Sequence, residues 1–292
     1  MARMGLFEYI SQTMKFNRRR MLKLTLVGGF ATFGYAWQIE PRWVAIQHLD
    51  MPIPDLTDSL VGKTCVQLSD LHIGLGVGES YLRRQFEYVK TLNPDFVFYT
   101  GDFVDFADNH HFKLLRKIMP DAPQGSIGTA GVLGNHDFAK HLDGTRITKR
   151  IEGFLNEVGI NILRDSAIEL GELRVAGLED FWSSKFRPKS ARDGIRSGER
   201  PSIVLSHNPD TADLDVWGDF NGWILCGHTH GGQCVIPFVG PPIIPVQNRD
   251  YVSGVYDLGS QRKMYINRGL GHTLKARFCA RPEITVFRLT KA

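Results

Sequence analysis

The stretch at 226–233, Cys-Gly-His-Thr-His-Gly-Gly-Gln, carries two histidines two residues apart, with glycines on both sides. It follows the apolar run Trp-Ile-Leu at 223–225, which is typical of a short buried strand. Two imidazoles at this spacing can converge on neighbouring metal ions if the backbone turns sharply after the strand, and glycine permits such a turn. His228 and His230 are therefore candidate metal ligands, provided that other parts of the chain supply further ligands.

Four further polar clusters follow strand-like apolar runs in the same way. In chain order, the residues of these clusters that could bind a metal or move a proton are Asp70, His72, Asp102, Asp105, Asn135, His136 and His207. In layered α/β proteins ligands bind beyond the carboxyl ends of the strands, so the clusters are expected to meet in space. Carboxylate, imidazole and amide oxygen together suit Mn, Fe, Zn or similar ions. The sequence thus predicts a metal centre at the strand ends.

The elements that would position these clusters are alternating strands and helices. Apolar runs predict strands at 64–68, 95–100, 129–133, 202–206 and 222–226. Helical spacing of apolar residues predicts helices at 79–92, 109–119 and 145–158. Further short strands are predicted at 160–163, 166–170, 172–177, 233–236, 251–257, 263–267 and 283–289. The alternation indicates an α/β fold, and the strand-rich C-terminal third indicates a second sheet.

Composition and charge exclude several classes of protein. The 292 residues can bury a full core, and the ordinary apolar content with mixed charge excludes a disordered or fibrous chain. The cysteines at 65, 226, 234 and 279 form no C-x-x-C pair, which excludes a zinc ribbon or a thioredoxin-like site. Residues 1–23 hold six basic residues and one acidic residue, so the remainder of a chain with net charge +4 is close to neutral. A broad nucleic-acid surface is therefore not expected.

Residues 1–40 are predicted to be a signal or anchor segment. Arg-Arg-Met-Leu-Lys at 19–23, followed by apolar residues to 37, resembles a twin-arginine export signal. This apolar stretch is shorter than the ~20 residues of a spanning helix, and no clear cleavage site follows it. We expect an uncleaved anchor on an exported protein, periplasmic or at the outer face of the cytoplasmic membrane; a cytoplasmic, membrane-associated leader is the alternative. Residues 41–61, with three prolines, are predicted to be a linker, or else an edge strand.

Taken in order, the five strand-end clusters resemble those of the calcineurin-like metallophosphoesterase superfamily. The resemblance covers nearly all of the predicted domain, residues 62–292. The closing Gly-His-Thr-His-Gly-Gly-Gln, together with the leader, looks like the twin-arginine-exported YkuE/YaeI-like bacterial phosphodiesterases. The resemblance implies a four-layer αββα sandwich, in which two packed mixed β-sheets are flanked by helices.

The resemblance also implies two divalent metal ions per chain, with Mn, Fe or Zn expected first and Mg or Ca as alternatives. Asp102 would bridge the two ions, because a carboxylate offers two oxygens. The remaining ligands would be Asp70, His72 and His230 for the first ion and Asn135, His207 and His228 for the second.

Other residues receive roles beside the metals from the same resemblance. His136 would protonate or stabilise the leaving oxygen, and Asp105 would orient His136. Arg268 and Arg277 are candidates for binding the substrate phosphate; the alternative is that they are ordinary surface arginines. The aromatic residues in the stretch 181–186 could cap the site, rest on a membrane surface or pack within the fold.

The implied activity is that of a dinuclear-metal-dependent phosphodiesterase, in which a metal-bound hydroxide attacks phosphorus in line. Asp105 is followed by Phe-Ala and His136 by Asp, whereas the protein serine/threonine phosphatases of this superfamily have Arg-Gly and Glu there, so a phosphoprotein substrate is not favoured. Two alternatives are a UDP-2,3-diacylglucosamine-type pyrophosphate hydrolase in lipid A synthesis and a non-catalytic metal-binding scaffold. The expected partners are a phosphodiester or lipid-linked pyrophosphate, the export machinery and a membrane surface.

Overall fold

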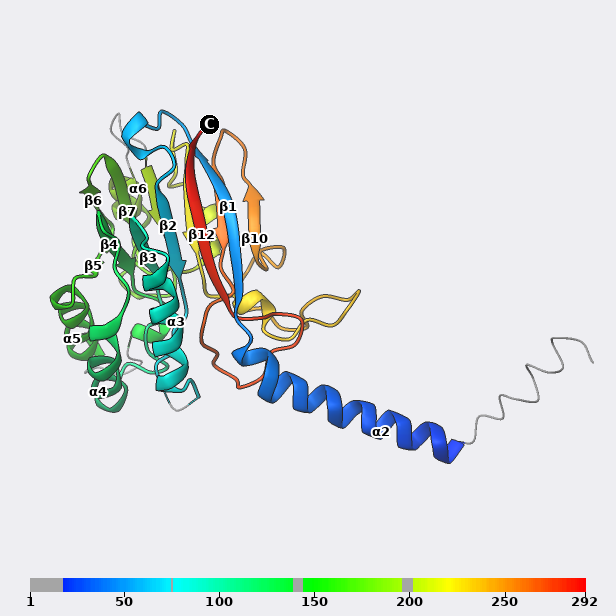
Figure 1. Cartoon of the computed structure of the whole chain (residues 1–292). Helices are drawn as coiled ribbons and strands as arrows, with labels where there is room; N and C mark the ends of the chain where they lie inside the picture. Colours follow the sequence, from blue (N-terminus) through cyan, green and yellow to red (C-terminus); the bar gives the residue numbers. More distant parts are fainter. Residues whose placement is uncertain (1–17, 75, 139–143, 196–201) are drawn as a thin grey trace, which may run out of the picture.

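The first of two β-sheets joins strands from the N-terminal half of the chain with one strand from its C-terminal part (Figure 1). Residues 18–74, 76–138, 144–195 and 202–292 are described in a computed structural model. The strands follow one another across the sheet as β1 (Ala45–Ile53), β12 (Glu283–Lys291), β2 (Thr64–Leu68), β3 (Phe96–Thr100), β4 (Gly128–Val132) and β5 (Asn161–Ile162). Neighbouring strands are parallel except for β12 and β2, which are antiparallel.

The second sheet has four parallel strands at its centre and one antiparallel strand on each side. Its order is β10 (Gly254–Asp257), β11 (Lys263–Ile266), β9 (Trp223–Cys226), β8 (Ser202–Leu205), β7 (Leu173–Gly177) and β6 (Ser166–Leu170). Both sheets are therefore mixed, which confirms the predicted pair of mixed sheets.

The two sheets pack face to face because side chains alternate between the two faces of each strand. In β3, Phe96 and Phe98 belong to an apolar layer that they share with Ile203 of the second sheet. Val97 and Tyr99 of the same strand face the other way, into a layer formed with helices. One short run of buried residues thus contributes to two separate core layers.

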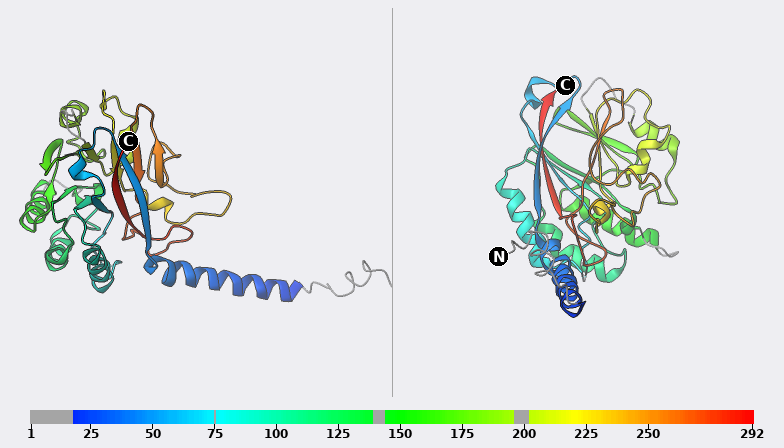
Figure 2. Two further views of the ribbon diagram at one scale, coloured as in Figure 1. Left: turned by 45° about the horizontal axis from the view of Figure 1, so that its top comes forward. Right: turned by 90° about the vertical axis from the view of Figure 1, so that its right-hand side faces the viewer.

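Helices cover the outer face of each sheet, which gives four layers (Figure 2). The first sheet is covered by α3 (Glu79–Thr91), α4 (Asn109–Ile118) and α5 (Gly144–Glu157), and α6 (Pro188–Ile195) packs on the second sheet. Shorter turns are η3 (Asp58–Leu60), η4 (Met119–Asp121), η5 (Asn135–Asp137), η6 (Pro209–Asp213) and η7 (His230–Gly232). The flanking helices expected for the fold class are confirmed.

Three segments refine or correct the sequence interpretation. In residues 41–61 the edge strand, left open as the alternative to a linker, is the one observed, because Ala45–Ile53 form β1 at the edge of the first sheet. Pro52 is tolerated there because an edge strand has a side that needs no N–H donor, and its carbonyl accepts a bond from the Trp223 indole at 2.8 Å. Residues 233–236 form no regular strand, only two isolated pairings, of Cys234 with Phe278 and of Ile236 with Gly240. The helix α6 lies where the sequence predicts no element.

An N-terminal helix, α2 (Arg18–Gly34), projects from the body and has no buried residue (Figures 1 and 2). It continues into a π-helical turn, η1 (Tyr35–Ile39), and a 3-10 turn, η2 (Glu40–Arg42). Among the residues that the structure describes, no helix combines the length and the apolar character needed to cross a bilayer. The start of the predicted leader, residues 1–17, lies outside the described residues.

Candidate metal centre

The loops after β2, β3, β4, β8 and β9 meet at one end of the two sheets. Within the first sheet, the amide of Asp70 donates to the carbonyl of Gly101 at 2.9 Å; within the second sheet, the amide of Gly227 donates to the carbonyl of His207 at 3.0 Å. The two sheets approach closely at Gly101, where a Cβ atom would lie 2.6 Å from Nδ1 of His207. The predicted strand-end clusters are thereby brought together.

Five of the candidate ligands hold left-handed backbone conformations that residues with a side chain rarely adopt. The φ angle is 51° at Asp70, 44° at His72, 54° at Asp102, 71° at His228 and 52° at His230. Each such conformation costs roughly 1–2 kcal/mol relative to an ordinary one. Strain of this kind persists where the surrounding structure fixes it, and it gathers at functional sites.

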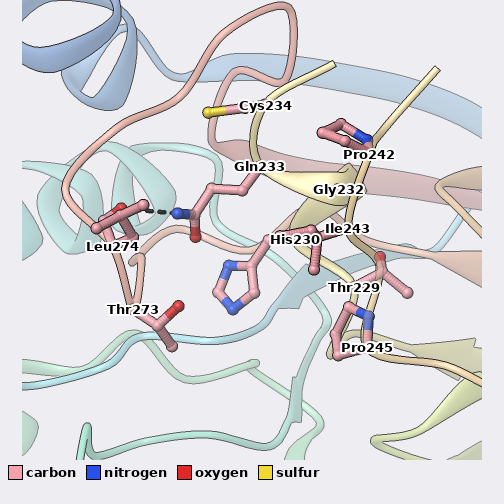
Figure 3. Close-up of a pocket in the computed structure, with 10 residues that line it drawn as sticks. All are labelled: Thr229, His230, Gly232, Gln233, Cys234, Pro242, Ile243, Pro245, Thr273 and Leu274. Atoms are coloured by element: carbon pink, nitrogen blue, oxygen red, sulfur yellow. Dashed lines mark hydrogen bonds between the residues drawn. The ribbon is translucent and has the colours of Figure 1, made fainter. Parts of the chain in front are cut away.

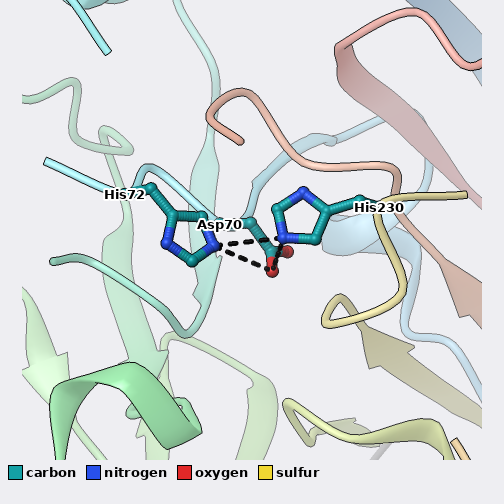
Figure 4. Close-up of side chains that lie close together, drawn as sticks. All are labelled: Asp70, His72 and His230. Atoms are coloured by element: carbon teal, nitrogen blue, oxygen red, sulfur yellow. Dashed lines mark hydrogen bonds and ion pairs between the residues drawn. The ribbon is translucent and has the colours of Figure 1, made fainter. Parts of the chain in front are cut away.

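Asp70, His72 and His230 form a first group of buried donor atoms (Figure 4). The Nε2 atoms of His72 and His230 lie 3.1 Å apart. Oδ1 of Asp70 is 3.4 Å from Nε2 of His230 and 4.0 Å from Nε2 of His72. Two imidazole nitrogens and a carboxylate oxygen therefore face one small space.

Asp102, His207 and His228 form a second buried group. Nε2 of His207 lies 3.2 Å from Oδ2 of Asp102 and 3.2 Å from Nδ1 of His228. The amide oxygen of Asn135 lies 3.2 Å from the same nitrogen of His207. Four side chains from four different strand ends thus surround one point.

The tautomers of two histidines follow from main-chain acceptors. Nδ1 of His207 lies 2.7 Å from the carbonyl of Thr100, and Nε2 of His228 lies 2.7 Å from the carbonyl of Pro245. A carbonyl can only accept, so each of these ring nitrogens carries the proton. The other nitrogen of each neutral ring then offers a lone pair to the centre, as a metal ligand does.

Asp102 is the carboxylate that lies between the two groups. Its Oδ2 is 3.2 Å from Nε2 of His207 and 3.6 Å from Nε2 of His72. Its Oδ1 accepts the amide of His136 at 2.9 Å, which fixes the orientation of the carboxylate. Asp102 is therefore placed to contact ions on both sides.

The pKa shifts of three donor groups favour the protonation states that a metal needs, whereas burial raises the pKa of Asp70, and the charge of Asp102 outweighs burial and raises the pKa of His207. Burial is the main cause that lowers the pKa of His228 to about 3 and the pKa of His230 well below its ordinary value. Burial alone would raise the pKa of Asp102, but the adjacent His207 and the neighbouring His72 hold that pKa well below its ordinary range. An anionic carboxylate and neutral imidazoles are the forms that bind divalent cations.

This donor set fits two divalent metal ions. The facing ring nitrogens within each group lie only 3.1 Å and 3.2 Å apart, close enough to bind a common cation. Carboxylate, imidazole and amide oxygen are also the ligands that ions such as Mn, Fe and Zn accept. The buried histidine and aspartate clusters are consistent with a dinuclear site.

His136 and Asp105 are in contact, but through an unexpected atom. Nδ1 of His136 lies 2.6 Å from the main-chain carbonyl of Asp105. The Asp105 carboxylate instead lies 3.6 Å from Nδ1 of His72. This is the ring nitrogen of His72 that faces away from the other donor atoms of the first group. The half-buried ring of His136 stands nearly perpendicular to the ring of His72, with 4.8 Å between the ring centres. The orienting contact therefore comes from the backbone at Asp105.

Asp137 has a structural role, as its sequence context indicates: it fastens the β3 and β4 loops together. Its buried carboxylate accepts the amides of Phe103 at 3.3 Å, Val104 at 3.1 Å and Gly134 at 2.9 Å. Burial, followed by the charge of Asp102, raises the pKa of Asp137 to about 7. The signal for this role is its position within the Asn-His-Asp cluster.

Arg277 does not fit the predicted role in binding substrate phosphate. Its guanidinium is fully buried and donates to the carbonyls of Gly271 at 2.6 Å, Arg268 at 2.8 Å and Ala280 at 2.8 Å. Arg268 is itself paired with the carboxylate of Glu283 at 2.5 Å. Both arginines are engaged within the protein, and Arg277 holds the loop 268–280 in shape against the metal centre.

Replacing Arg277 with methionine should lower the free energy of unfolding by about 2–4 kcal/mol, because several buried carbonyls lose a charged donor. Lysine should rescue little, since it lacks the planar set of five donors. Chemical denaturation measures the change, and the exposed Arg249→Met serves as the control. A large rise in KM for a small phosphodiester, with unchanged stability, would instead restore a substrate role for Arg277.

The aromatic stretch after β7 contributes one side chain to the site. The ring of Trp182 lies perpendicular to that of His228, with 4.5 Å between their centres, and it stays half exposed. Phe181 and Phe186 pack against each other at 5.5 Å. The sequence left three possibilities for these aromatic residues: capping the site, resting on a membrane, or packing within the fold. Trp182 caps the site, and the two phenylalanines pack within the fold.

An apolar cavity of about 310 Å³ opens beside the first group of donors (Figure 3). Its walls are Thr229, His230, Gly232, Gln233, Cys234, Pro242, Ile243, Pro245, Thr273 and Leu274. The Gln233 side chain donates to the carbonyl of Leu274 at 2.8 Å and so joins two of the loops that form the walls. Sequence analysis did not find this cavity, because its residues come from loops without periodicity.

Comparison with known proteins agrees with this geometry. The sequence model of the family described as calcineurin-like phosphoesterase matches residues 63–232. Phosphodiesterase YaeI of Escherichia coli (strain K12) is 29% identical over 94% of this chain and 99% of that protein. The uncharacterized metallophosphoesterase YkuE of Bacillus subtilis (strain 168) is 33% identical over 94% and 98%. The UDP-2,3-diacylglucosamine pyrophosphatase LpxG of Chlamydia trachomatis is 26% identical over 91% and 95%.

Proposed function

The chain belongs to the calcineurin-like phosphoesterase family, and from that premise we propose that it is a phosphodiesterase that depends on two divalent metal ions. The observation that carries the proposal is the position of Asp102. Its carboxylate lies within 3.6 Å of His72 from one group of donors and within 3.2 Å of His207 from the other. A carboxylate shared in this way is the centre of a dinuclear site.

In this proposal each group of side chains holds one ion. The ligands are Asp70, His72 and His230 for one ion, Asn135, His207 and His228 for the other, and Asp102 for both. Two bound ions supply positive charge that attracts a phosphate ester and acidify a coordinated water. Because Asn135 is an uncharged ligand, the site carries less negative charge than it would with a carboxylate there. An anionic substrate is therefore repelled less.

His136 acts on the leaving group. The carbonyl of Asp105 accepts a hydrogen bond from the Nδ1–H group of His136, which holds the ring in place. In the imidazolium form of the ring, Nε2 also carries a proton, which it can give to the departing oxygen. Since the ring is half buried, a substrate can reach it while much of the bulk water is excluded.

Removing the metal ions should abolish the activity. The full chain loaded with Mn should hydrolyse bis(p-nitrophenyl) phosphate, and treatment with a chelator should lower kcat/KM by at least about a hundredfold, because the residues alone supply little charge stabilisation. Adding Mn or Zn back should restore the rate. Full activity in protein shown to be free of metal, or no hydrolysis with two ions bound, would contradict the proposal.

A lipid-linked pyrophosphate is the second candidate substrate, favoured by the apolar cavity beside His230 and by the activity in the name of the relative LpxG. A panel of nucleotide diesters, glycerophosphodiesters and UDP-diacylglucosamine separates the candidates.

We also propose that the N-terminal segment exports the protein and holds it at the outer face of the membrane. Cell fractionation bears on both points, because a UDP-linked sugar is a cytoplasmic compound.

A further inference from the structure

The loop at residues 236–243, which follows β9 and the turn with His228 and His230, exposes large apolar side chains to solvent. Residues 236–240 form a tight turn, in which the amides and carbonyls of Ile236 and Gly240 bond to each other at 2.9 Å and 3.0 Å. Phe238 at its tip is fully exposed, Val239 is 77% exposed, and Ile243 just after the turn is 79% exposed. A group of large apolar side chains exposed in this way marks an interaction surface.

This loop borders the same cavity that contains His230. Ile243 forms part of the wall, and the half-exposed Leu274 faces it from the loop 268–280 (Figure 3). The exposed apolar group therefore lies at the mouth of a cavity that leads to the proposed ligands of one metal ion.

Helix α2 extends on the same side of the body as this loop (Figures 1 and 2). Its position is fixed by the turns that follow it. The carbonyl of Ala36 accepts the amide of Arg277 at 2.9 Å, and the buried carboxylate of Glu40 accepts the amide of Ala280 at 2.7 Å. The base of α2 is thus tied to the loop 268–280, which also forms part of the cavity wall.

The composition of α2 identifies the partner. Its exposed apolar side chains are Met21, Leu22, Leu24, Leu26, Val27, Phe30 and Phe33. Its first residues are three arginines, Lys23 follows, and the helix has no acidic residue. Exposed apolar side chains next to a cluster of basic ones match an anionic lipid surface. A second copy whose α2 packed parallel to the first would bring the basic ends together, which like charge disfavours.

We propose that α2 and the turn 236–243, with Leu274, form a docking face for an anionic lipid bilayer. The apolar side chains enter the interface, and the basic start of α2 contacts the lipid headgroups. Since Ile243 and Leu274 belong both to this face and to the cavity wall, phosphoesters held in the bilayer meet the metal centre at the membrane surface. This last step rests on the phosphodiesterase function proposed above; the docking itself does not.

The depth of Phe238 in the bilayer provides the test. Tryptophan is placed at this position in the full chain, and its added fluorescence is measured with phosphatidylglycerol–phosphatidylcholine vesicles that carry brominated acyl chains. The matched control is Val61→Trp, which follows η3 at the end of the first sheet opposite the metal centre. We expect the added signal at 238 to fall by about half or more and the signal at 61 to stay constant, because a residue in the interface reaches the acyl chains.

A second pair of variants measures affinity. Phe238→Asn with Val239→Ser removes the apolar tip, and asparagine tolerates the left-handed φ of 68° at position 238. This variant should bind anionic vesicles at least about tenfold more weakly, whereas Val61→Ser with Val255→Ser should bind like the wild type. Hydrolysis of bis(p-nitrophenyl) phosphate should be unchanged in both variants.

Three results would overturn the docking face. They are equal quenching at positions 238 and 61, wild-type vesicle affinity of the tip variant, and conversion of a dimer to a monomer by that variant. Vesicle binding is measured independently of catalysis. If the protein docks as expected but hydrolyses no phosphodiester, only the proposed function fails.

Discussion

Replacing Asp102 with asparagine should abolish phosphodiester hydrolysis and remove most of both bound metal ions. The substitution keeps the shape of the side chain but removes the negative charge that faces His72 and His207 from 3.6 Å and 3.2 Å. We expect kcat/KM to fall by at least about a thousandfold, since both ions lose a shared ligand. Metal content per chain, measured by mass spectrometry after dialysis, should fall below one ion.

His228→Ala is the matched control for the bridging role. His228 belongs to only one of the two groups of donors, so this variant should lose one ion and retain the other. His230→Ala should show the converse, because it belongs to the first group. If Asp102→Asn retained two ions, or lost only one as His228→Ala does, Asp102 would not join the two sites.

Replacing His136 with alanine should lower kcat by about 10²–10⁴-fold while leaving two metal ions bound, because a proton donor contributes to the rate and not to metal affinity. The effect should depend on the leaving group. A nitrophenolate needs little protonation and should lose the smaller factor, whereas an alkyl leaving group should lose the larger one. Rates for a series of alkyl aryl and dialkyl phosphodiesters measure this difference.

The position of His136 also defines the contrary outcome. A ring nitrogen of His136 lies within 4.8 Å of the donor atoms of His72 and Asp102, which is close enough for a third group around a metal. Loss of one ion in His136→Ala, with an equal rate loss for all leaving groups, would make His136 a ligand. Asp105→Asn should act more weakly than His136→Ala, because the contact with His136 comes from the main chain of Asp105.

The parts of the fold that sequence analysis predicted are those in which local pattern decides structure. The helix predicted at 79–92 corresponds to α3, and the strand predicted at 166–170 corresponds to β6. Short, fully buried runs that end in polar residues predicted the strand ends, and the strand ends placed the candidate ligands. In such cases the apolar pattern that identifies a helix or strand in the sequence lies within that helix or strand itself.

The remainder depends on contacts between distant segments. β1 looked like a linker, because its proline and its mixed polarity suit an edge strand only once β12 is beside it. Arg277 in Lys-Ala-Arg looked exposed, because the carbonyls that surround it come from a loop whose path the sequence does not show. At Asp105 the sequence identified the residue but could not distinguish its carbonyl from its carboxylate.

The pairing of β1 with β12 also sets an order for biosynthesis. Within the described part of the chain, β1 has β12 as its strand neighbour in the sheet, and nearly the whole body lies between them in the sequence. During translation β1 emerges early and must wait for β12 before it has a partner. The base of α2 waits in the same way for the loop 268–280. The N-terminal segment therefore cannot attach to the body until the loop 268–280 and β12 have been synthesised.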